Sequence, residues 1–262
     1  MRGPTAAPRQ GRPDDPAATG SATHPGDGVP GFRITGLNWP RLAWYQEILA
    51  IIAGDALYEM IRASAPQKAG LAFHNAAVLT ALEPRAVTDA EVWLRGFTVN
   101  HAIVTHLFTW YYAIFHLSAT VSVLVWLWWR RPRGYARART ALFALTFGGL
   151  LIFWVFPVAP PRLLTPEAIN ALGTPAIAAL DGTGGVTGAV SSLVNPYAAF
   201  PSLHVAWAAW CAWAVWANVR SPRRWAAWLY PLGTIIVVVG TANHYVIDVL
   251  GGLFLVFLAV LL

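Results

Sequence analysis

Apolar residues form long segments through most of the chain after residue 41, and short polar stretches separate them. Several of these segments approach the roughly 20 residues that an α-helix needs to cross a bilayer. We therefore predict an all-α membrane protein built as a bundle of six transmembrane helices. The predicted spans are Leu42–Ile61, Thr105–Trp129, Thr140–Phe156, Leu203–Val219, Trp225–Thr241 and Tyr245–Leu262.

The first predicted span differs from the others because three acidic residues interrupt it. Glu47, Asp55 and Glu59 fall on one side of the expected helix. Acidic residues inside a membrane are costly unless they face other protein groups. Their spacing is therefore typical of a helix whose polar side is turned into a bundle.

The segment before the first span consists mainly of Pro, Gly, Ala, Arg and Asp over residues Met1–Phe32. So few large apolar side chains cannot offset the entropy of ordering the backbone, and the apolar core of a cleaved signal peptide is missing. We expect residues 1–35 to form a disordered cytoplasmic tail and residues 36–262 to form a transmembrane domain.

Composition excludes an ordinary soluble protein. The chain is 56% apolar and 11% charged, whereas a typical globular domain has about 25% charged residues. Its 14 tryptophans are typical of bilayer interfaces. Cys211 is the single cysteine, which excludes an intrachain disulfide and a cysteine-based zinc site. Lys68 is the single lysine, and this preference for arginine indicates a GC-rich genome and a bacterial source.

Arginines explain the net charge of +6 and predict the orientation of the chain in the cell membrane. They lie in two connections between predicted spans, Arg130, Arg131, Arg133, Arg137 and Arg139 in one and Arg220, Arg223 and Arg224 in the other. Connections rich in Arg stay in the cytoplasm. The long connections Arg62–Val104 and Pro157–Pro201 are then extracytoplasmic. We expect a bilayer rather than nucleic acid as the partner, and the sequence leaves the oligomeric state open.

Two stretches of the first extracytoplasmic connection have an amphipathic pattern. They are Ala69–Leu82 and Asp89–Phe97. A helix with one apolar and one polar side is suited to lie along a membrane surface. We expect these stretches to follow the interface.

The segment Asn195–His204 is the first candidate for chemistry, since it leads into the fourth predicted span. Pro201 suits the first turn of a helix, and a helix N-terminus near Ser202 binds anions through its N–H groups. His204 follows one turn later and can exchange protons with a bound group. A helix start with a histidine present by chance is an equally good interpretation of this segment alone.

His244 and Asp248 form the second candidate, between the fifth and sixth spans. Residues four apart share a helix face, so the aspartate can accept a hydrogen bond from the imidazole and leave its other nitrogen nucleophilic. A structural pair is the alternative, but ionisable pairs in a membrane segment are more often functional.

Arg162 is the third candidate, where the third span ends in Pro157-Val-Ala-Pro-Pro-Arg162. The prolines hold the side chain at the level of both histidines, where it can bind phosphate oxygens. A solvated arginine is the competing interpretation. The predicted number of spans places Arg162, His204 and His244 on one side of the membrane, although the orientation was inferred from other arginines.

These residues resemble the type 2 phosphatidic acid phosphatase superfamily of lipid phosphatases, phosphotransferases and vanadium haloperoxidases. The resemblance extends over most of Leu42–Leu262. It is strongest with the branch of inositol phosphorylceramide synthases and bacterial relatives, in Pro157–Arg162, Asn195–His204 and Asn243–Gly252.

The resemblance implies a role for each of the two histidines and for the aspartate. His244 would attack phosphorus and become phosphohistidine, His204 would protonate the leaving oxygen, and Asp248 would orient the nucleophile. It also implies that the reaction needs no metal ion and no cofactor.

The chain departs from the superfamily pattern at the phosphate site. Leu203 replaces the glycine of Pro-Ser-Gly-His, Val237 and Val238 replace a Ser-Arg pair, and no clear Lys-x6-Arg-Pro element precedes the loop. Arg162 is therefore the main candidate cation. The further candidates for phosphate binding are Ser202, Leu203, His116 and Tyr112, whereas His101 and His106 are expected to be core residues.

We predict a membrane lipid-phosphate phosphatase or phosphotransferase with its site on the extracytoplasmic face. The substrate is a lipid or prenyl phosphate, and the sequence leaves hydrolysis and transfer open. Two alternatives remain: a prenyl-diphosphate enzyme, in which the tryptophans stabilise a cation, and a catalytically silent membrane binding protein.

Overall fold

The computed structural model describes residues 69–163, residues 197–262 and some of the positions between 45 and 60. All of them belong to one compact unit. The predicted tail, most of the first predicted span and residues 164–196 lie outside the described residues. The described positions of the first predicted span are helical.

The described chain is helical nearly throughout, which confirms the predicted all-α class. Its elements are α2 (Ala69–Ala81), α3 (Arg85–Asn100), α4 (Ala102–Trp110), the π-helical turn η1 (Tyr111–Phe115), α5 (His116–Arg130), α6 (Pro132–Val155), the 3₁₀ turns η2 (Pro161–Leu163) and η4 (Pro222–Trp228), α9 (Leu203–Asn218), α10 (Leu229–Gly240) and α11 (Val246–Val260).

Helix α6 begins earlier than the sequence predicts, because the arginine-rich stretch assigned to a loop is helical. Pro132 occupies the first turn, where its missing N–H costs nothing. Arg137 then donates to the Val260 carbonyl at 2.7 Å, and Arg139 is buried. Arg137 therefore joins α6 to the end of α11, and this arginine-rich stretch is part of a helix and not a loop.

Helix α9 lies at the centre of the bundle. It packs against α5, α6, α10 and α11. Its buried positions are largely alanine, and Trp210 donates its indole N–H to the Ala138 carbonyl at 2.8 Å. Small side chains let the surrounding helices approach closely. The first turn of α9 is therefore held in place from several sides.

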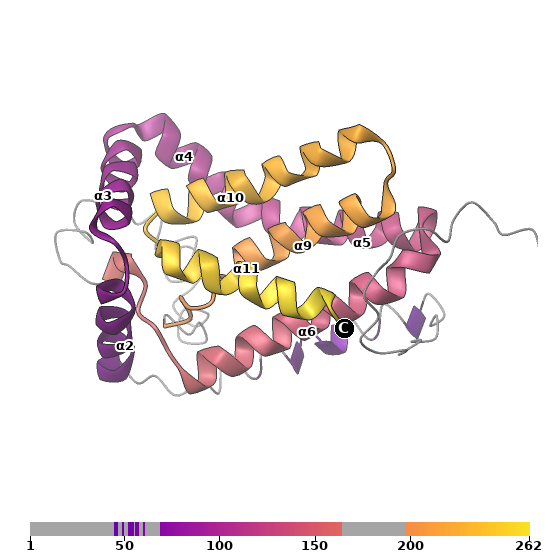
Figure 1. The fold of residues 1–262 in the computed structure, drawn as a ribbon, viewed down its shortest axis with the longest axis horizontal. Coiled ribbons are helices and arrows are strands. Elements are labelled where there is room, and N and C mark those ends of the chain that lie inside the picture. The colour runs from indigo at the N-terminus through magenta and orange to yellow at the C-terminus, as the bar shows by residue number, and fades with distance from the viewer. Residues whose placement is uncertain are drawn as a thin grey trace, which may run out of the picture. The chain divides into compact units, whose positions relative to one another are not determined.

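Helices α2 and α3 run across one end of the bundle rather than along it (Figure 1). On α3 the outward side chains Val92, Trp93 and Phe97 are exposed, whereas Glu91 and Thr98 are buried. This is the reverse of the pattern of a water-soluble helix. It is suited to a helix whose outer side meets lipid, as the predicted interfacial position requires.

Two helical segments of the described chain are long and apolar enough to cross a membrane. They are Ala102–Arg130, which joins α4, η1 and α5, and Pro132–Val155. Large apolar side chains also project outward from α11, where Leu250, Phe254 and Phe257 are exposed. Helices α9, α10 and α11 are shorter, so the count of six spans stays a prediction.

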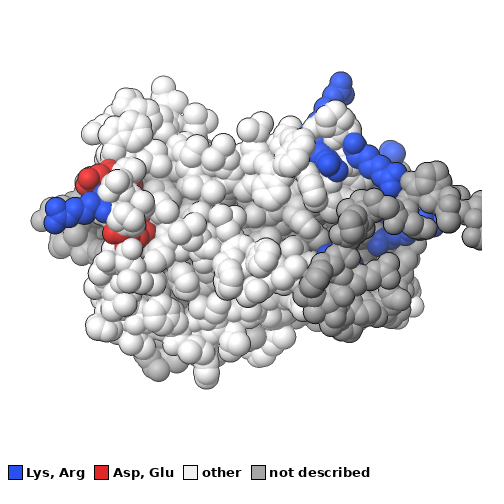
Figure 2. All heavy atoms as spheres, in the orientation of Figure 1, with Lys and Arg blue, Asp and Glu red and all other residues white. Residues whose placement is uncertain are grey.

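Charged residues lie at the two ends of the bundle (Figure 2). Arginines gather at the end where α5 joins α6 and α9 joins η4, whereas acidic and basic residues lie together at the end where α2 and α3 lie. On this face the surface between the two ends shows no charged side chains. An uncharged band between charged ends is the surface expected of a protein that sits in a bilayer.

Candidate active site

Three segments far apart in the sequence meet at the end of the bundle that carries α2. They are residues 157–163, 197–204 and 242–248. Residues 157–163 and 197–204 pair through an isolated parallel bridge between Val158 and Ala198. The Val158 N–H donates to the Tyr197 carbonyl at 2.8 Å, and the Ala199 N–H donates to the Val158 carbonyl at 3.2 Å. Helix α2 covers this pair, since Asn75 donates to the Pro157 carbonyl at 2.9 Å.

Ser202 caps the N-terminus of α9, so Pro201 lies just before the cap and not in the first turn of the helix, where the sequence placed it. Its hydroxyl accepts the Val205 N–H at 3.5 Å, and its own N–H donates to the Asp248 carbonyl at 2.9 Å. Leu203 and His204 then supply the first N–H groups of the helix, which have no acceptor inside it. Such a helix end favours an anion.

Leu203 replaces the family glycine without blocking this helix end. Its side chain is buried and points toward α6, where Gly149 leaves the space for it. A Cβ atom at position 149 would lie 2.6 Å from a Leu203 methyl carbon. The leucine therefore joins the core, and the backbone around it keeps its place at the site.

His244 is held in the tight turn between α10 and α11. The N–H groups of Asn243 and His244 both donate to the Val238 carbonyl, at 3.0 Å and 3.1 Å. Ala242 takes a positive φ of 56°, an uncommon conformation for a residue with a side chain. Backbone strain of this kind is concentrated at functional sites.

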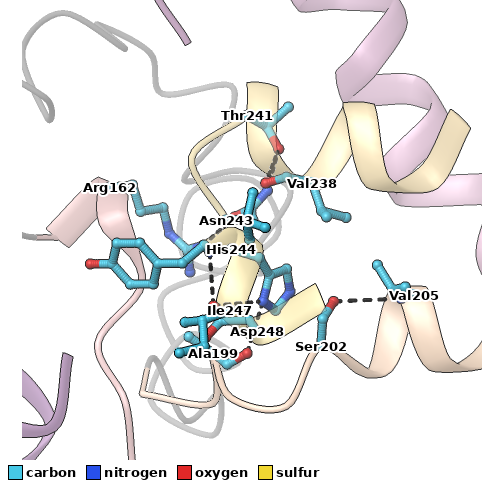
Figure 3. A network of polar contacts seen from close by, with 12 residues as sticks. Arg162, Ala199, Ser202, Val205, Val238, Thr241, Asn243, His244, Ile247 and Asp248 are labelled. Carbon is cyan, nitrogen blue, oxygen red and sulfur yellow. Dashed lines mark hydrogen bonds and ion pairs between the residues drawn. The ribbon is translucent and has the colours of Figure 1, made fainter. Parts of the chain in front are cut away.

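Two oxygen atoms lie close to Nδ1 of His244 (Figure 3). The Ala199 carbonyl oxygen lies 2.8 Å away and the Asp248 carboxylate 3.4 Å away. The sequence predicted Asp248 as the acceptor, but the backbone carbonyl is nearer. A proton held on Nδ1 by this carbonyl leaves Nε2 with the lone pair that a nucleophile needs.

Asp248 is fully buried and uses one oxygen to accept the Tyr245 N–H at 2.9 Å. Its other oxygen, Oδ1, is buried and makes no hydrogen bond to the described residues. The aspartate thus serves the first turn of α11 as well as the imidazole of His244.

His204 lies beside His244, with 5.9 Å between the ring centroids. Tyr112 stacks on the His204 ring at 4.2 Å, and the His116 ring meets it edge-on at 4.5 Å. The π-helical turn η1 precedes His116, and single π-turns are frequent at functional sites. The structure therefore brings four of the residues predicted from the sequence into one group.

Arg162 reaches the same turn from η2. Its guanidinium donates to the Asn243 side-chain oxygen, and its backbone N–H donates to the Ala242 carbonyl at 3.0 Å. Asn243 also donates to the Thr241 hydroxyl at 2.9 Å. Arg162 is thus fixed next to His244 by a residue that sequence reasoning did not single out.

Three further residues of the site were missed. Ala199 contributes only a carbonyl group, which no side-chain pattern reveals. Glu83 and Glu91 come from the α2–α3 segment and accept N–H groups at the start of α11. Burial raises the pKa of both carboxyl groups above the ordinary value of 4.5. His101 and His106, expected in the core, are exposed instead, because their part of the chain faces away from the bundle.

No group of three or more His, Cys, Asp or Glu side chains arranged to hold a metal ion occurs in the part of the chain that the structure describes. The groups gathered at the site include the imidazoles of His116, His204 and His244, one guanidinium and the N–H groups at the start of α9. These groups are suited to a phosphate ester, with a nucleophile and a proton donor close together.

The chain belongs to the PAP2 superfamily. The model of this family matches residues 77–262, which include all three segments of the site. The match confirms the resemblance to type 2 phosphatidic acid phosphatases. Members of this superfamily are membrane phosphatases and phosphotransferases that act on phosphate esters.

One curated relative is the inositol phosphorylceramide synthase catalytic subunit aur1 of Schizosaccharomyces pombe. It is 30% identical over 168 residues, which cover 59% of this chain and 39% of the relative. The chain therefore spans well under half the length of that protein. No solved structure gave a significant match.

Proposed function

We propose that this protein is a lipid-phosphate phosphatase or phosphotransferase that works through a phosphohistidine on His244. The observation that carries the proposal is the pairing of His204 with His244, at 5.9 Å between ring centroids, while the Ala199 carbonyl holds Nδ1 of His244. One imidazole is thereby prepared as a nucleophile, and the other is near enough to move a proton at the same phosphate.

Arg162 and the start of α9 are the proposed phosphate-binding groups. The guanidinium is anchored by Asn243 beside His244, and Ser202 and Leu203 lie where α9 offers its unpaired N–H groups. A guanidinium and a helix N-terminus both stabilise the negative charge of phosphate oxygens. Tyr112 and His116 pack against the His204 ring and so belong to the same proposed site.

The reaction would run in two steps. In the first, Nε2 of His244 forms a bond to phosphorus, the bond to the lipid alcohol breaks, and His204 gives its proton to the departing oxygen. In the second, His204 takes a proton from water or from a second alcohol, whose oxygen displaces His244. Water yields free phosphate, and an alcohol yields a transferred head group.

The orientation of the chain supports a site on the extracytoplasmic face. Helix α9 runs from Ser202 at the site to the connection that holds Arg220, Arg223 and Arg224. Arginine-rich connections stay in the cytoplasm, so the opposite end of α9 faces outward. The lipid tail would remain in the bilayer beside the exposed apolar side chains of the bundle.

A labelling experiment tests the proposal. Purified protein in lipid-containing micelles is mixed with ³²P-labelled phosphatidic acid, prenyl phosphates or prenyl diphosphates. The reaction is quenched in base or in acid and examined for bound label and for released products. We expect label that survives base and is lost in acid, as a phosphoramidate is, and no label in His244→Ala. A hydrocarbon product from a prenyl diphosphate would instead support an ionising enzyme. Turnover without bound label would overturn the phosphohistidine.

The acceptor is the second question for the same preparation. The relative from Schizosaccharomyces pombe is the catalytic subunit of an inositol phosphorylceramide synthase. This relationship supports testing lipid and polyol alcohols beside water as acceptors. Transfer to an alcohol at the expense of free phosphate would identify a phosphotransferase, and free phosphate alone would identify a phosphatase.

A further inference from the structure

Two helix N-termini meet at the candidate site, and different kinds of side chain cap them. At α9 the cap is the neutral hydroxyl of Ser202. At α11 three successive N–H groups donate to carboxylates: Tyr245 to Asp248 at 2.9 Å, Val246 to Glu91 at 2.5 Å, and Ile247 to Glu83 at 2.8 Å. The end of α11 is therefore closed to an outside anion.

The two glutamates come from a distant part of the chain. Glu91 lies 155 residues before Val246, and Glu83 lies 164 residues before Ile247. Local sequence does not provide a cap of this kind. It exists because the α2–α3 segment crosses the end of the bundle and α3 packs on α10.

Glu91 is the better fixed of the two acids. Its side chain is 2% exposed, and its second oxygen accepts from Arg95 at 2.7 Å. The Arg95 guanidinium also lies over the Tyr245 ring, 5.7 Å from its centroid. Glu91 and Arg95 of α3 therefore both contact the first turn of α11, Glu91 at the Val246 N–H and Arg95 at the Tyr245 ring.

That turn controls the catalytic groups directly. His244 immediately precedes Tyr245, the residue at the helix start, and Asp248 is the third residue inside the helix. A small movement of the turn would shift the imidazole relative to Ala199 and His204. Misplacement of a reacting group by about 1 Å can cost roughly 100-fold in rate.

We propose that Glu91, assisted by Glu83, is a positioning residue: its carboxylate caps α11, sets His244 and Asp248 in place, and keeps the substrate phosphate at the α9 end. The proposal rests on the proposed function. Without these acids the start of α11 would offer N–H groups to phosphate and compete with α9. With them, a phosphate near α11 meets negative charge instead.

The test compares Glu91→Ala, Glu91→Gln and Glu83→Ala with Asp89→Ala, in which an exposed acid of the same helix is removed. Glutamine keeps the side-chain oxygen that accepts the Val246 N–H, whereas alanine removes it. Turnover of an aryl phosphate is measured in micelles, together with hydrogen exchange of the peptide Asn243–Leu250.

We expect Glu91→Ala to lower kcat by about 10- to 100-fold with KM nearly unchanged, and to speed exchange at the start of α11. Glu91→Gln should restore most of both, and Asp89→Ala should match the native protein. Loss of folding alone would reduce the amount of active enzyme without the rescue by glutamine.

The two readouts separate this proposal from the proposed function. If the native protein shows no turnover and no phosphohistidine, the function fails, and exchange alone decides whether Glu91 holds α11. Should Glu91→Ala not fold, Glu83→Ala carries the same comparison. The positioning role is overturned if Glu91→Ala and Glu83→Ala both show the same hydrogen exchange and the same kcat as Asp89→Ala.

Discussion

His204 and His244 have different surroundings, and the difference predicts different effects of mutation. His244 is buried and bonded through Nδ1, as a nucleophile must be, so His244→Ala should abolish turnover of every substrate. His204 is the proposed proton donor. Its replacement by alanine should cost about 10²–10⁴-fold with an alkyl phosphate and much less with an aryl phosphate, which departs without protonation.

The measurement is the rate of each variant on an alkyl and an aryl ester of phosphate, with intact folding checked by the native elution volume in detergent. His204→Ala losing both substrates, with His244→Ala retaining the aryl one, would show that the two roles are reversed.

Arg162 ends the proline-rich segment Pro157–Arg162, and its contribution depends on charge and on geometry. Arg162→Ala removes a charged donor and should lower kcat/KM by about 10²–10³-fold. Arg162→Lys keeps the charge but loses the planar fork, so it should fall between alanine and the native residue. Asn243→Ala should resemble the lysine variant, because the guanidinium stays but loses its anchor.

Steady-state kinetics on one lipid phosphate would rank these variants. Equal activity of the alanine, lysine and native proteins would remove Arg162 from the phosphate site and direct attention to His116.

At the scale of helices, the contact between α11 and the start of α9 determines whether the two histidines meet. Gly252 makes this contact possible, since a Cβ atom there would lie 2.4 Å from the Ser202 carbonyl oxygen. The Ser202 carbonyl belongs to the backbone, so it cannot move away from an added Cβ atom as a flexible side chain could. We expect Gly252→Ala to destabilise the protein by about 1–3 kcal/mol and to abolish most activity.

Gly96 supplies a matched control on α3, where an added Cβ meets nothing within 4 Å. Gly96→Ala should leave activity unchanged and favour the helix slightly. Thermal unfolding in detergent and aryl phosphate turnover would compare the two variants. Equal behaviour of Gly252→Ala and Gly96→Ala would show that the helix contact is not tight in solution.

The carboxylates on the α2–α3 segment predict how stability changes with pH. Burial raises the pKa of Glu91 and of Glu83, while Arg95 and the α11 N–H groups act in the opposite direction. Above about pH 4.5 the folded protein therefore holds protons that the unfolded chain has released, and the free energy of unfolding falls as pH rises through this window.

Unfolding midpoints measured from acid to neutral pH would test the sign. Glu91→Gln should flatten the decline because it removes one titrating group. A native protein that gains stability over this range would contradict the raised pKa values.

Across the whole molecule, the sequence predicted the bundle more completely than the site. Long apolar segments gave the described helices their approximate places, and counting spans put Arg162, His204 and His244 at one end. The start of α6 was misplaced because an arginine that packs on another helix, as Arg137 does, looks the same in sequence as an arginine in a loop. Ala199 and Glu91 were missed because their roles depend on contacts across 45 and 155 residues, which no local pattern encodes.

The charged ends of the bundle lead to a prediction about the whole molecule in its membrane. The arginine-rich end beside η4 and the α2–α3 end, where acidic and basic residues are mixed, should face opposite sides of the bilayer, with the arginine-rich end in the cytoplasm. Ala86 on α3 and Ser221 beside η4 are both exposed, so cysteines there can report on the two sides. Ala86→Cys should react in intact cells with a maleimide that does not cross membranes. Ser221→Cys should react only after the cells are opened, and the native protein should not react because Cys211 is buried. Labelling of Ser221→Cys alone in intact cells would reverse the orientation and place the proposed chemistry on the cytoplasmic side.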